Sequence, residues 1–119
     1  MSFRFFKFKV YSDTKMLHKK VVHTTKRFPR EFFYLKDQLR RSSLSIILQI
    51  AEGSAKRSDK DFNRYIEMGM GSANETAAGL EVAFAEKLIG ETEFKDILSL
   101  CEEVVNQLGG FSKKLLVGS

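Results

Sequence analysis

Tryptophan is absent from the sequence, and cysteine and proline occur once each, as Cys101 and Pro29. A lone cysteine cannot form an internal disulfide, which fits a reducing compartment. One proline in 119 residues favours long helices over a turn-rich sheet protein. The longest apolar run, Ile46–Ala51, is interrupted by Gln49 and is far too short to span a bilayer. We therefore expect a cytoplasmic protein that has no membrane partner.

The residues that most catalytic and metal sites need are also scarce. His18 and His23 are the only histidines, and a spacing of five places them on different faces of a helix. No cysteine and histidine have the spacing of metal ligands. Gly69–Ser72 is glycine-rich, but it lacks the preceding strand and the Gly-Lys pair of a phosphate loop. The sequence therefore predicts no catalytic residue, no metal, no cofactor and no small-molecule substrate, and it favours a protein that is not an enzyme.

Helical periodicity is what the chain has in abundance. Apolar residues three and four apart predict helices over about 13–28, 30–52, 60–88 and 92–116. Pro29 is expected to end the first helix, Ser58 or Asp59 to cap the third, and Gly90 to end the third. Four helices with short connections predict an all-α fold. We expect an antiparallel up-down-up-down four-helix bundle in a single domain, residues 1–119.

The first eleven residues follow a different pattern. Phe6, Phe8 and Val10 alternate with lysines, and a period of two is typical of extended chain. Residues 1–11 are therefore predicted to form a short extended N-terminal segment. Without a partner strand, it would lie across its own bundle or a neighbouring subunit. Its phenylalanines could stack on single-stranded bases. Packing is the favoured interpretation, because exposed phenylalanines in a row invite aggregation.

The second predicted helix carries two apolar stripes. The second stripe, at Leu44, Ile47, Leu48 and Ala51, lies beside the stripe that faces the bundle. A helix that is apolar on two faces has to be covered on both. This segment is therefore either the central helix of the bundle or an oligomer contact.

Charge is divided unevenly along the chain. Residues 1–64 carry 16 Lys and Arg against 6 Asp and Glu, a balance of +10, whereas residues 65–119 carry 4 against 9, a balance of −5. A basic half is typical of a polyanion-binding face. A basic half beside an acidic half is equally typical of two halves that attract each other, within one subunit or between subunits.

Four pieces of the sequence carry a family resemblance: KVY, FPREFFYLKDQLRRSSLSI, IAEGSAKRSDKDFNRYI and GSANET. In this order, over roughly residues 6–116, they resemble the four-helix-bundle family encoded in intervening sequences of bacterial 23S ribosomal RNA genes. The chain departs from the usual motif at Ile47, Gln49 and Ala73, where the family has proline, asparagine and leucine. The resemblance implies a ring-like homopentamer. It also implies distant kinship with accessory proteins of diversity-generating retroelements, which bind nucleic acid.

Some polar residues are expected to join the second and third helices. An antiparallel pair turning near Arg57 would place Arg40 and Arg41 close to Glu75. One arginine is expected to bond a carboxylate across the interface, and the other is left to bind phosphate. Glu52 is expected to make another such contact. We therefore assign Arg41, Glu52 and Glu75 to interhelical polar contacts.

The remaining basic residues lead to a functional hypothesis. The residues expected to bind a nucleic-acid backbone are Lys19, Lys20, Arg40, Lys56, Arg57, Lys60 and Arg64. In this hypothesis the protein is a non-enzymatic homo-oligomer whose partner is RNA or DNA. In the alternative, it is a structural or protein-interaction scaffold with no nucleic-acid ligand, in which the basic half of one subunit meets the acidic half of the next.

Overall fold

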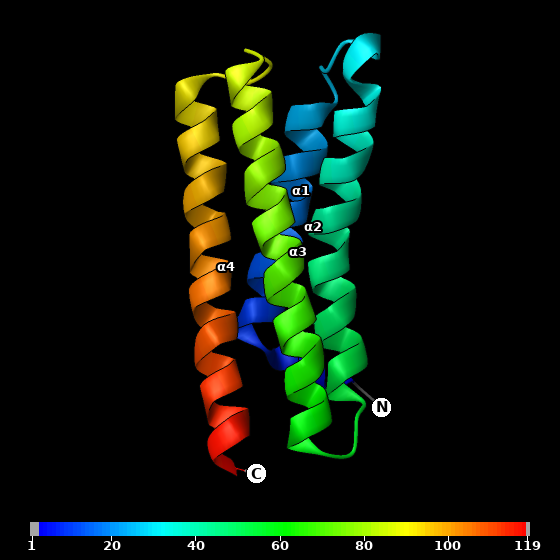
Figure 1. Ribbon diagram of the computed structural model, residues 1–119, viewed down its shortest axis with the longest axis vertical. Helices are drawn as coiled ribbons and strands as arrows, with labels where there is room; N and C mark the ends of the chain where they lie inside the picture. Colours follow the sequence, from blue (N-terminus) through cyan, green and yellow to red (C-terminus); the bar gives the residue numbers. More distant parts are fainter. Residues whose placement is uncertain (1–2, 119) are drawn as a thin grey trace.

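The computed structural model describes residues 3–118, and its four long α-helices run up, down, up and down the bundle (Figure 1). Its elements are η1 (Arg4–Lys7), α1 (Lys9–Thr25), η2 (Arg30–Phe32), α2 (Phe33–Ser54), α3 (Asp59–Ala85) and α4 (Glu91–Gly118), where η marks a short 3₁₀ helix. Within residues 3–118 there is no strand. Both α1 and α3 pack against α2 and α4, so the helices close into a ring around one core. The predicted all-α four-helix bundle is confirmed.

The core is built from one apolar stripe of each helix. Leu17 of α1, Ile46 of α2, Leu80 of α3 and Leu108 of α4 are all fully buried. These positions belong to the spacing of three and four residues that is visible in the sequence, because that spacing returns a side chain to the same helical face. None of the helices in residues 3–118 is long and apolar enough to cross a membrane.

The N-terminal prediction is wrong for the part of residues 1–11 that the structure describes. Arg4–Lys7 forms a 3₁₀ turn, and α1 begins at Lys9. Val10 is buried and Phe8 is half-buried, whereas Phe6, Lys7 and Lys9 are exposed. A short segment without a partner strand gains more from helical hydrogen bonds and core contacts than from extension. The turn packs on α1 and α2 of its own chain. The first two residues lie outside the described part.

The start of α3 follows the prediction. The Ser58 side chain accepts a hydrogen bond of 3.1 Å from the main-chain N–H of Asp61, so it satisfies one of the free donors at the helix N-terminus.

The end of α3 differs from the prediction that Gly90 would end this helix. The helix ends at Ala85, and Lys87 adopts the left-handed conformation with φ of 62°. The N–H of Lys87 donates to the carbonyl of Phe84, and the N–H of Leu88 donates to that of Ala83, which is a Schellman motif closed by a lysine. Gly90 was expected in this role. Instead, the carbonyl oxygen of Gly90 accepts a hydrogen bond from the main-chain N–H of Phe94, in the first turn of α4.

Helices α2 and α3 approach each other closely at Gly53. A Cβ atom added to Gly53 would lie 2.7 Å from Cβ of Tyr65 and 2.9 Å from the Phe62 ring, whereas Gly71 has nothing within 4 Å. The C-terminal end of α2 therefore contacts α3 at a position where any side chain would force the two helices to shift.

Candidate nucleic-acid interface

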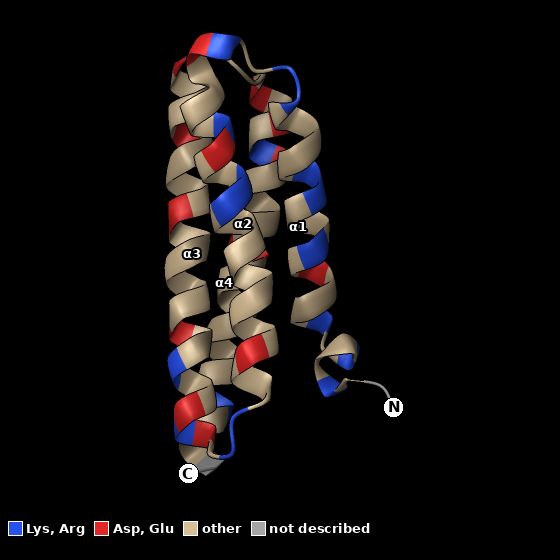
Figure 2. Ribbon diagram, turned by 90° about the vertical axis from the view of Figure 1, so that its right-hand side faces the viewer, with Lys and Arg blue, Asp and Glu red and all other residues tan. Residues whose placement is uncertain are grey.

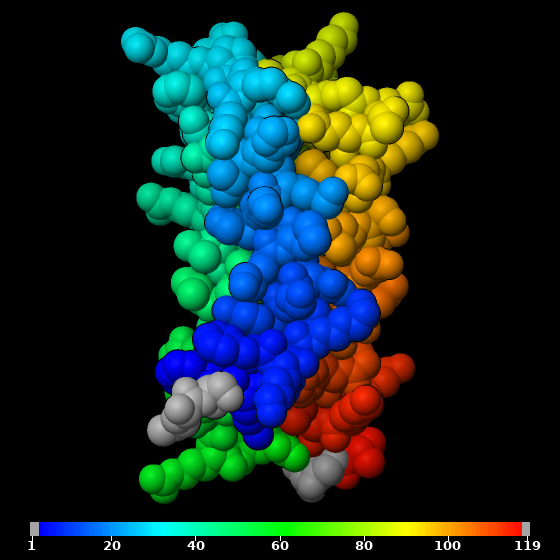
Figure 3. All heavy atoms as spheres, turned by 180° about the vertical axis from the view of Figure 1, so that it is seen from behind, coloured from blue at the N-terminus to red at the C-terminus, as the bar shows by residue number. Residues whose placement is uncertain are grey.

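The outer side of α1 separates two grooves of different charge. In the space-filling view, α1 lies between α2 and α4 (Figure 3). The groove toward α2, called here the α1–α2 groove, has a volume of about 520 Å³. Its lining is basic or apolar and includes no carboxylate: Tyr11, Lys15, His18, Lys19, Val22, His23, Lys26 and Ile47. The groove toward α4 holds about 330 Å³, and Glu93 and Asp96 are part of its lining.

Ion pairs to α4 neutralise one basic residue of α1 and one in the connection that follows it. Lys20 Nζ lies 3.0 Å from Asp96 Oδ2, and Arg27 Nη2 lies 2.8 Å from Glu93 Oε1. No such pair forms at Lys15, Lys19 or Lys26 anywhere in residues 3–118. Basic residues are distributed along α1, while α3 carries much of the acidic charge (Figure 2). Lys15 and Lys26 therefore contribute positive charge to the α1–α2 groove alone, whereas Lys19 lies between the two grooves and lines both.

Arg40 bridges α2 and α1 beside this groove. Its Nε donates to Thr25 Oγ1 at 2.9 Å, and its Nη2 donates to the carbonyl oxygen of Val22 at 3.1 Å. The guanidinium thus turns toward α1 rather than toward α3, and it adds a fixed positive charge next to the lysines.

His18 adds a polar group to the floor of the groove without adding a full charge. Its Nδ1 lies 2.8 Å from Ser43 Oγ on α2. Burial lowers the pKa of His18 below its usual 6.5, and the nearby charge of Arg40 lowers that pKa further. The imidazole is therefore neutral at pH 7, and the lysines supply the positive charge of the groove.

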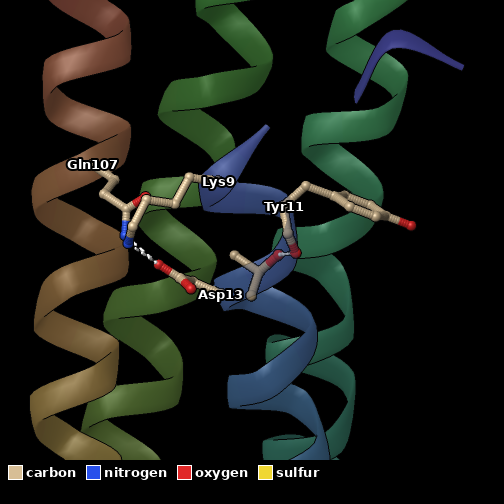
Figure 4. Close-up of polar contacts among 5 residues, drawn as sticks. Lys9, Tyr11, Asp13 and Gln107 are labelled. Carbon is tan, nitrogen blue, oxygen red and sulfur yellow. Dashed lines mark hydrogen bonds and ion pairs between the residues drawn. The ribbon is translucent and has the colours of Figure 1, made fainter. Parts of the chain in front are cut away.

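Aromatic side chains adjoin the groove where α1 begins. Tyr11 lines the groove, and its ring points toward α2, whereas Asp13 leaves α1 on the opposite side (Figure 4). The Tyr11 ring centroid lies 5.0 Å from that of Phe5 and 5.8 Å from that of Phe6. The Phe6 side chain is 55% exposed, and that of Phe3 is 60% exposed. We call Phe3, Phe5, Phe6 and Tyr11 the aromatic cluster, and Tyr11 makes it continuous with the groove.

Asp13 fixes the position of this part of α1 on α4. Gln107 Nε2 of α4 donates to Asp13 Oδ2 at 2.7 Å, and Lys9 Nζ lies at the same distance (Figure 4). The bonds from Lys9 and then Gln107 lower the pKa of the Asp13 carboxyl below its usual value. Asp13 thus holds the start of α1 against α4, on the side of the helix opposite Tyr11.

Four of the predicted binding residues lie at the α2–α3 turn, and none of them lines the groove. Arg57 and Lys60 are exposed. The other two contact Tyr65: Lys56 Nζ lies 4.9 Å and Arg64 Cζ 5.9 Å from the ring centroid. Asp59 and Asp61 occupy the first turn of α3 among these residues, which reduces the local positive potential. Of the rest of the predicted set, Lys19 lines the α1–α2 groove, Arg40 lies beside it on α2, and Lys20 pairs with Asp96 on the α4 side.

Hydroxyl groups make most of the polar contacts between α2 and α3. Ser42 Oγ and Thr76 Oγ1 are 2.8 Å apart, and Ser72 Oγ donates to Ser45 Oγ at 2.9 Å. The predictions did not include these pairs, although Ser42 falls in an otherwise apolar stripe, which is a signal of a buried polar contact.

Of the three residues predicted to make such contacts, Glu75 makes one, whereas Arg41 and Glu52 make none within residues 3–118. Glu75 accepts a hydrogen bond of 3.3 Å from Gln38 of α2. Arg41 and Glu52 are exposed, and their side chains make no hydrogen bond or ion pair with the rest of residues 3–118.

Cys101 lies in the core and has the surroundings of an unreactive thiol. Its Sγ donates to the carbonyl oxygen of Ala73 at 3.3 Å. Burial, with a smaller contribution from Glu102, raises the pKa of the thiol to about 11, so the nucleophilic thiolate is strongly disfavoured. Among the residues that the structure describes, no three His, Cys, Asp or Glu side chains are grouped to hold a metal ion.

Comparison with known proteins places the chain in a family. Residues 7–110 match the family described as 23S rRNA-intervening sequence protein. The chain belongs to this family. The bundle is also similar to the crystal structure of a protein of unknown function from the S23 ribosomal protein family of Bacteroides thetaiotaomicron VPI-5482. The TM-score is 0.82 at 24% sequence identity, over 87% of this chain and 98% of that chain, a likeness that shows the fold. A search of the curated proteins gives no match.

The positions at which this 23S rRNA-intervening sequence protein departs from the family motif have separate structural roles. Ile47 lines the α1–α2 groove, so the residue that replaces the usual proline contributes to the candidate interface. Ala73 is buried, and its carbonyl accepts the Cys101 thiol. Gln49 is partly buried against Gly69 of α3.

Proposed function

We propose that this 23S rRNA-intervening sequence protein is a non-enzymatic, self-associating bundle that binds RNA or DNA backbone through its basic half. The observation that carries the proposal is the charge of the α1–α2 groove. Its lining has three lysines without carboxylate partners in residues 3–118, and Arg40 lies beside them. Lysines held this close together gain affinity for phosphates by releasing the counterions of the nucleic acid.

The direct test is a binding titration of labelled structured RNA, duplex DNA and single-stranded DNA, each at low and at physiological salt. We expect binding at low salt that weakens steeply as salt rises, because counterion release makes the logarithm of the binding constant fall linearly with the logarithm of salt. Absence of binding to all three at low salt would refute the proposal.

The part played by the α2–α3 turn is tested by reversing charge there. The variant Lys56→Glu, Arg57→Glu, Lys60→Glu should weaken binding at low salt if the turn adds to the positive field. Unchanged affinity of this variant would exclude the turn from the interface. Lys95→Glu is the control, because Lys95 is exposed on α4, outside the basic half, and pairs with Glu91.

The apolar face of α2 supports self-association. Leu44 and Leu48 are 41% and 55% exposed, although the pattern of the sequence requires them to be covered. We propose that a second copy of the chain covers them, in the pentamer that the family resemblance implies. Leu48→Lys should lower the mass measured by light scattering, and Val117→Lys, at another exposed apolar position, should not. Equal masses of Leu48→Lys and the parent chain would argue against this contact.

A protein scaffold without a nucleic-acid ligand is the second candidate. The ion pairs of Lys20 with Asp96 and of Arg27 with Glu93 favour it, because they show basic residues already bound to carboxylates of the acidic half. If subunits are held together by such pairs, the mass of the assembly should fall in high salt. If the apolar face of α2 holds them, the mass should not change.

A further inference from the structure

Basic and aromatic residues form one continuous surface along α1. Tyr11, Lys15, Lys19, Val22 and Lys26 are spaced by three and four residues, which places them on one helical face. From Lys15 to Lys26 this stripe extends about 16 Å at the usual helical rise. All five residues line the α1–α2 groove, and Tyr11 continues it into the aromatic cluster.

The chemistry of this surface distinguishes between kinds of nucleic acid. A duplex presents phosphates outward and keeps its base faces stacked, so it would use the lysines and leave the rest of the groove without a role. The groove also has an apolar floor at Val22 and Ile47, and it leads to Phe3 and Phe6, whose rings are largely exposed. A positive groove beside exposed aromatic rings is the arrangement that binds single strands, because unpaired bases stack on the rings while the backbone follows the charge.

The α2–α3 turn does not offer the same surface. Its basic residues alternate with Asp59 and Asp61. Cations lie over a tyrosine ring at both places, Lys56 and Arg64 at Tyr65 and Lys15 at Tyr11, so the carboxylates are the difference between them. The α1–α2 groove has no carboxylate in its lining. An occupant that is negatively charged throughout its length fits this groove better than it fits the turn.

We infer that the α1–α2 groove is a binding site for single-stranded nucleic acid, with phosphates along Lys15, Lys19 and Lys26 and bases stacked on the aromatic cluster. The inference rests on the proposed function and assigns it a site and a class of ligand. Either RNA or DNA would satisfy the chemistry, since backbone charge and base faces are common to both.

The test measures fluorescence anisotropy of a labelled 15-nucleotide oligo-dT, the matching oligo-U and a 15-base-pair duplex over a range of salt. The groove variant is Lys15→Gln, Lys19→Gln, Lys26→Gln. Its control is Lys95→Gln, Lys113→Gln, Lys114→Gln, which removes the same charge from exposed positions of α4. The affinity of the groove variant for single strands should be at least tenfold lower. The slope of the logarithm of its binding constant against the logarithm of salt should be less negative by about two. The control should lose much less.

The aromatic contribution is tested separately with Phe6→Ala and its control Phe33→Ala, another exposed phenylalanine. Loss of one stacked base should weaken single-strand binding about tenfold and leave duplex binding unchanged. Circular dichroism of each variant establishes that the bundle is folded before binding is compared.

The outcomes separate this inference from the proposed function. If no nucleic acid binds the parent chain at low salt, both are overturned. If nucleic acid binds but the duplex is preferred, or the groove variant behaves like its control, the site is wrong and the proposed function stands. If the groove variant lowers the mass of the assembly and leaves single-strand affinity unchanged, the occupant of the groove is a second copy of the chain, and the inference is overturned.

Discussion

Arg40 Nη2 donates a hydrogen bond of 3.1 Å to the carbonyl oxygen of Val22, one of the last four carbonyls of α1. Such carbonyls have no main-chain N–H partner in the regular helix, and a positive charge near them is favoured by the helix dipole. The Val22 oxygen also accepts a bond of 3.2 Å from the Thr25 hydroxyl. A side chain of α2 thus completes the end of α1 and holds the two helices together beside the groove.

Replacing this arginine should therefore destabilise the bundle. Arg40→Met keeps the length of the side chain but removes the bonds to Val22 and Thr25, and the free energy of unfolding should fall by about 2 kcal/mol. Arg41→Met is the matched control, because Arg41 is exposed and its side chain has no partner in residues 3–118. It should change stability by less than about 0.5 kcal/mol. Urea denaturation measures both, and equal effects would show that the bonds of Arg40 contribute nothing specific.

Two glycine substitutions should have opposite effects. Gly53→Ala places a Cβ atom 2.7 Å from the Tyr65 Cβ, which is close to the α3 backbone and cannot easily move, so we expect a loss of roughly 2 kcal/mol. Gly71→Ala introduces no contact within 4 Å and should stabilise α3 by about 1 kcal/mol through helix propensity. Thermal unfolding of both variants provides the comparison. A stabilised Gly53→Ala protein would contradict the close approach of α2 and α3.

The end of α3 gives a route to a more stable protein. Lys87 adopts a left-handed backbone conformation that costs a non-glycine residue about 1 kcal/mol. Lys87→Gly should recover most of this energy and raise the melting temperature. Lys87→Ala separates backbone from side chain, since it removes the lysine side chain but keeps the Cβ atom. If the alanine variant is stabilised as much as the glycine variant, the left-handed conformation is not the cause.

Stability should depend on the protonation of His18. Its pKa is lower in the folded protein than the 6.5 of the free side chain, so the unfolded chain binds the proton more readily. The contribution of His18 is therefore present in full above pH 6.5 and is lost as pH falls from there toward the folded pKa. Between pH 7.5 and 5.5, the free energy of unfolding should decrease less in His18→Gln than in the parent chain. Identical slopes would show that His18 has no such role.

The thiol of Cys101 should be inert in the folded protein. It is buried, and its pKa is about 11, so almost no thiolate exists at pH 8. A disulfide reagent should therefore label the native protein slowly and the urea-unfolded protein at once. Rapid labelling of the native protein would contradict the position of Cys101 in the core.

The amino-acid sequence by itself determined the class of fold and the faces of the helices. The spacing of apolar residues such as Leu39, Ile66 and Leu108 returns each side chain to one helical face, and all three are fully buried. Ser58 could be recognised as a cap, because a cap depends on a side chain and the next three residues. These features are local, or they repeat with the period of the helix.

Tertiary structure decided the rest, because the outcomes depend on contacts between distant residues. Residues 6–10 alternate as a strand would, yet burial of Val10 in the core favours a helix. Arg40 could have faced α3, α1 or solvent, and in the folded chain its guanidinium donates to Thr25 and Val22 of α1. Lys20 and Lys19 are adjacent and chemically identical, but within residues 3–118 only Lys20 forms an ion pair, with Asp96 of α4. Which charges remain available to a partner is therefore set by the packing of α1 between α2 and α4, and helical periodicity alone does not contain that information.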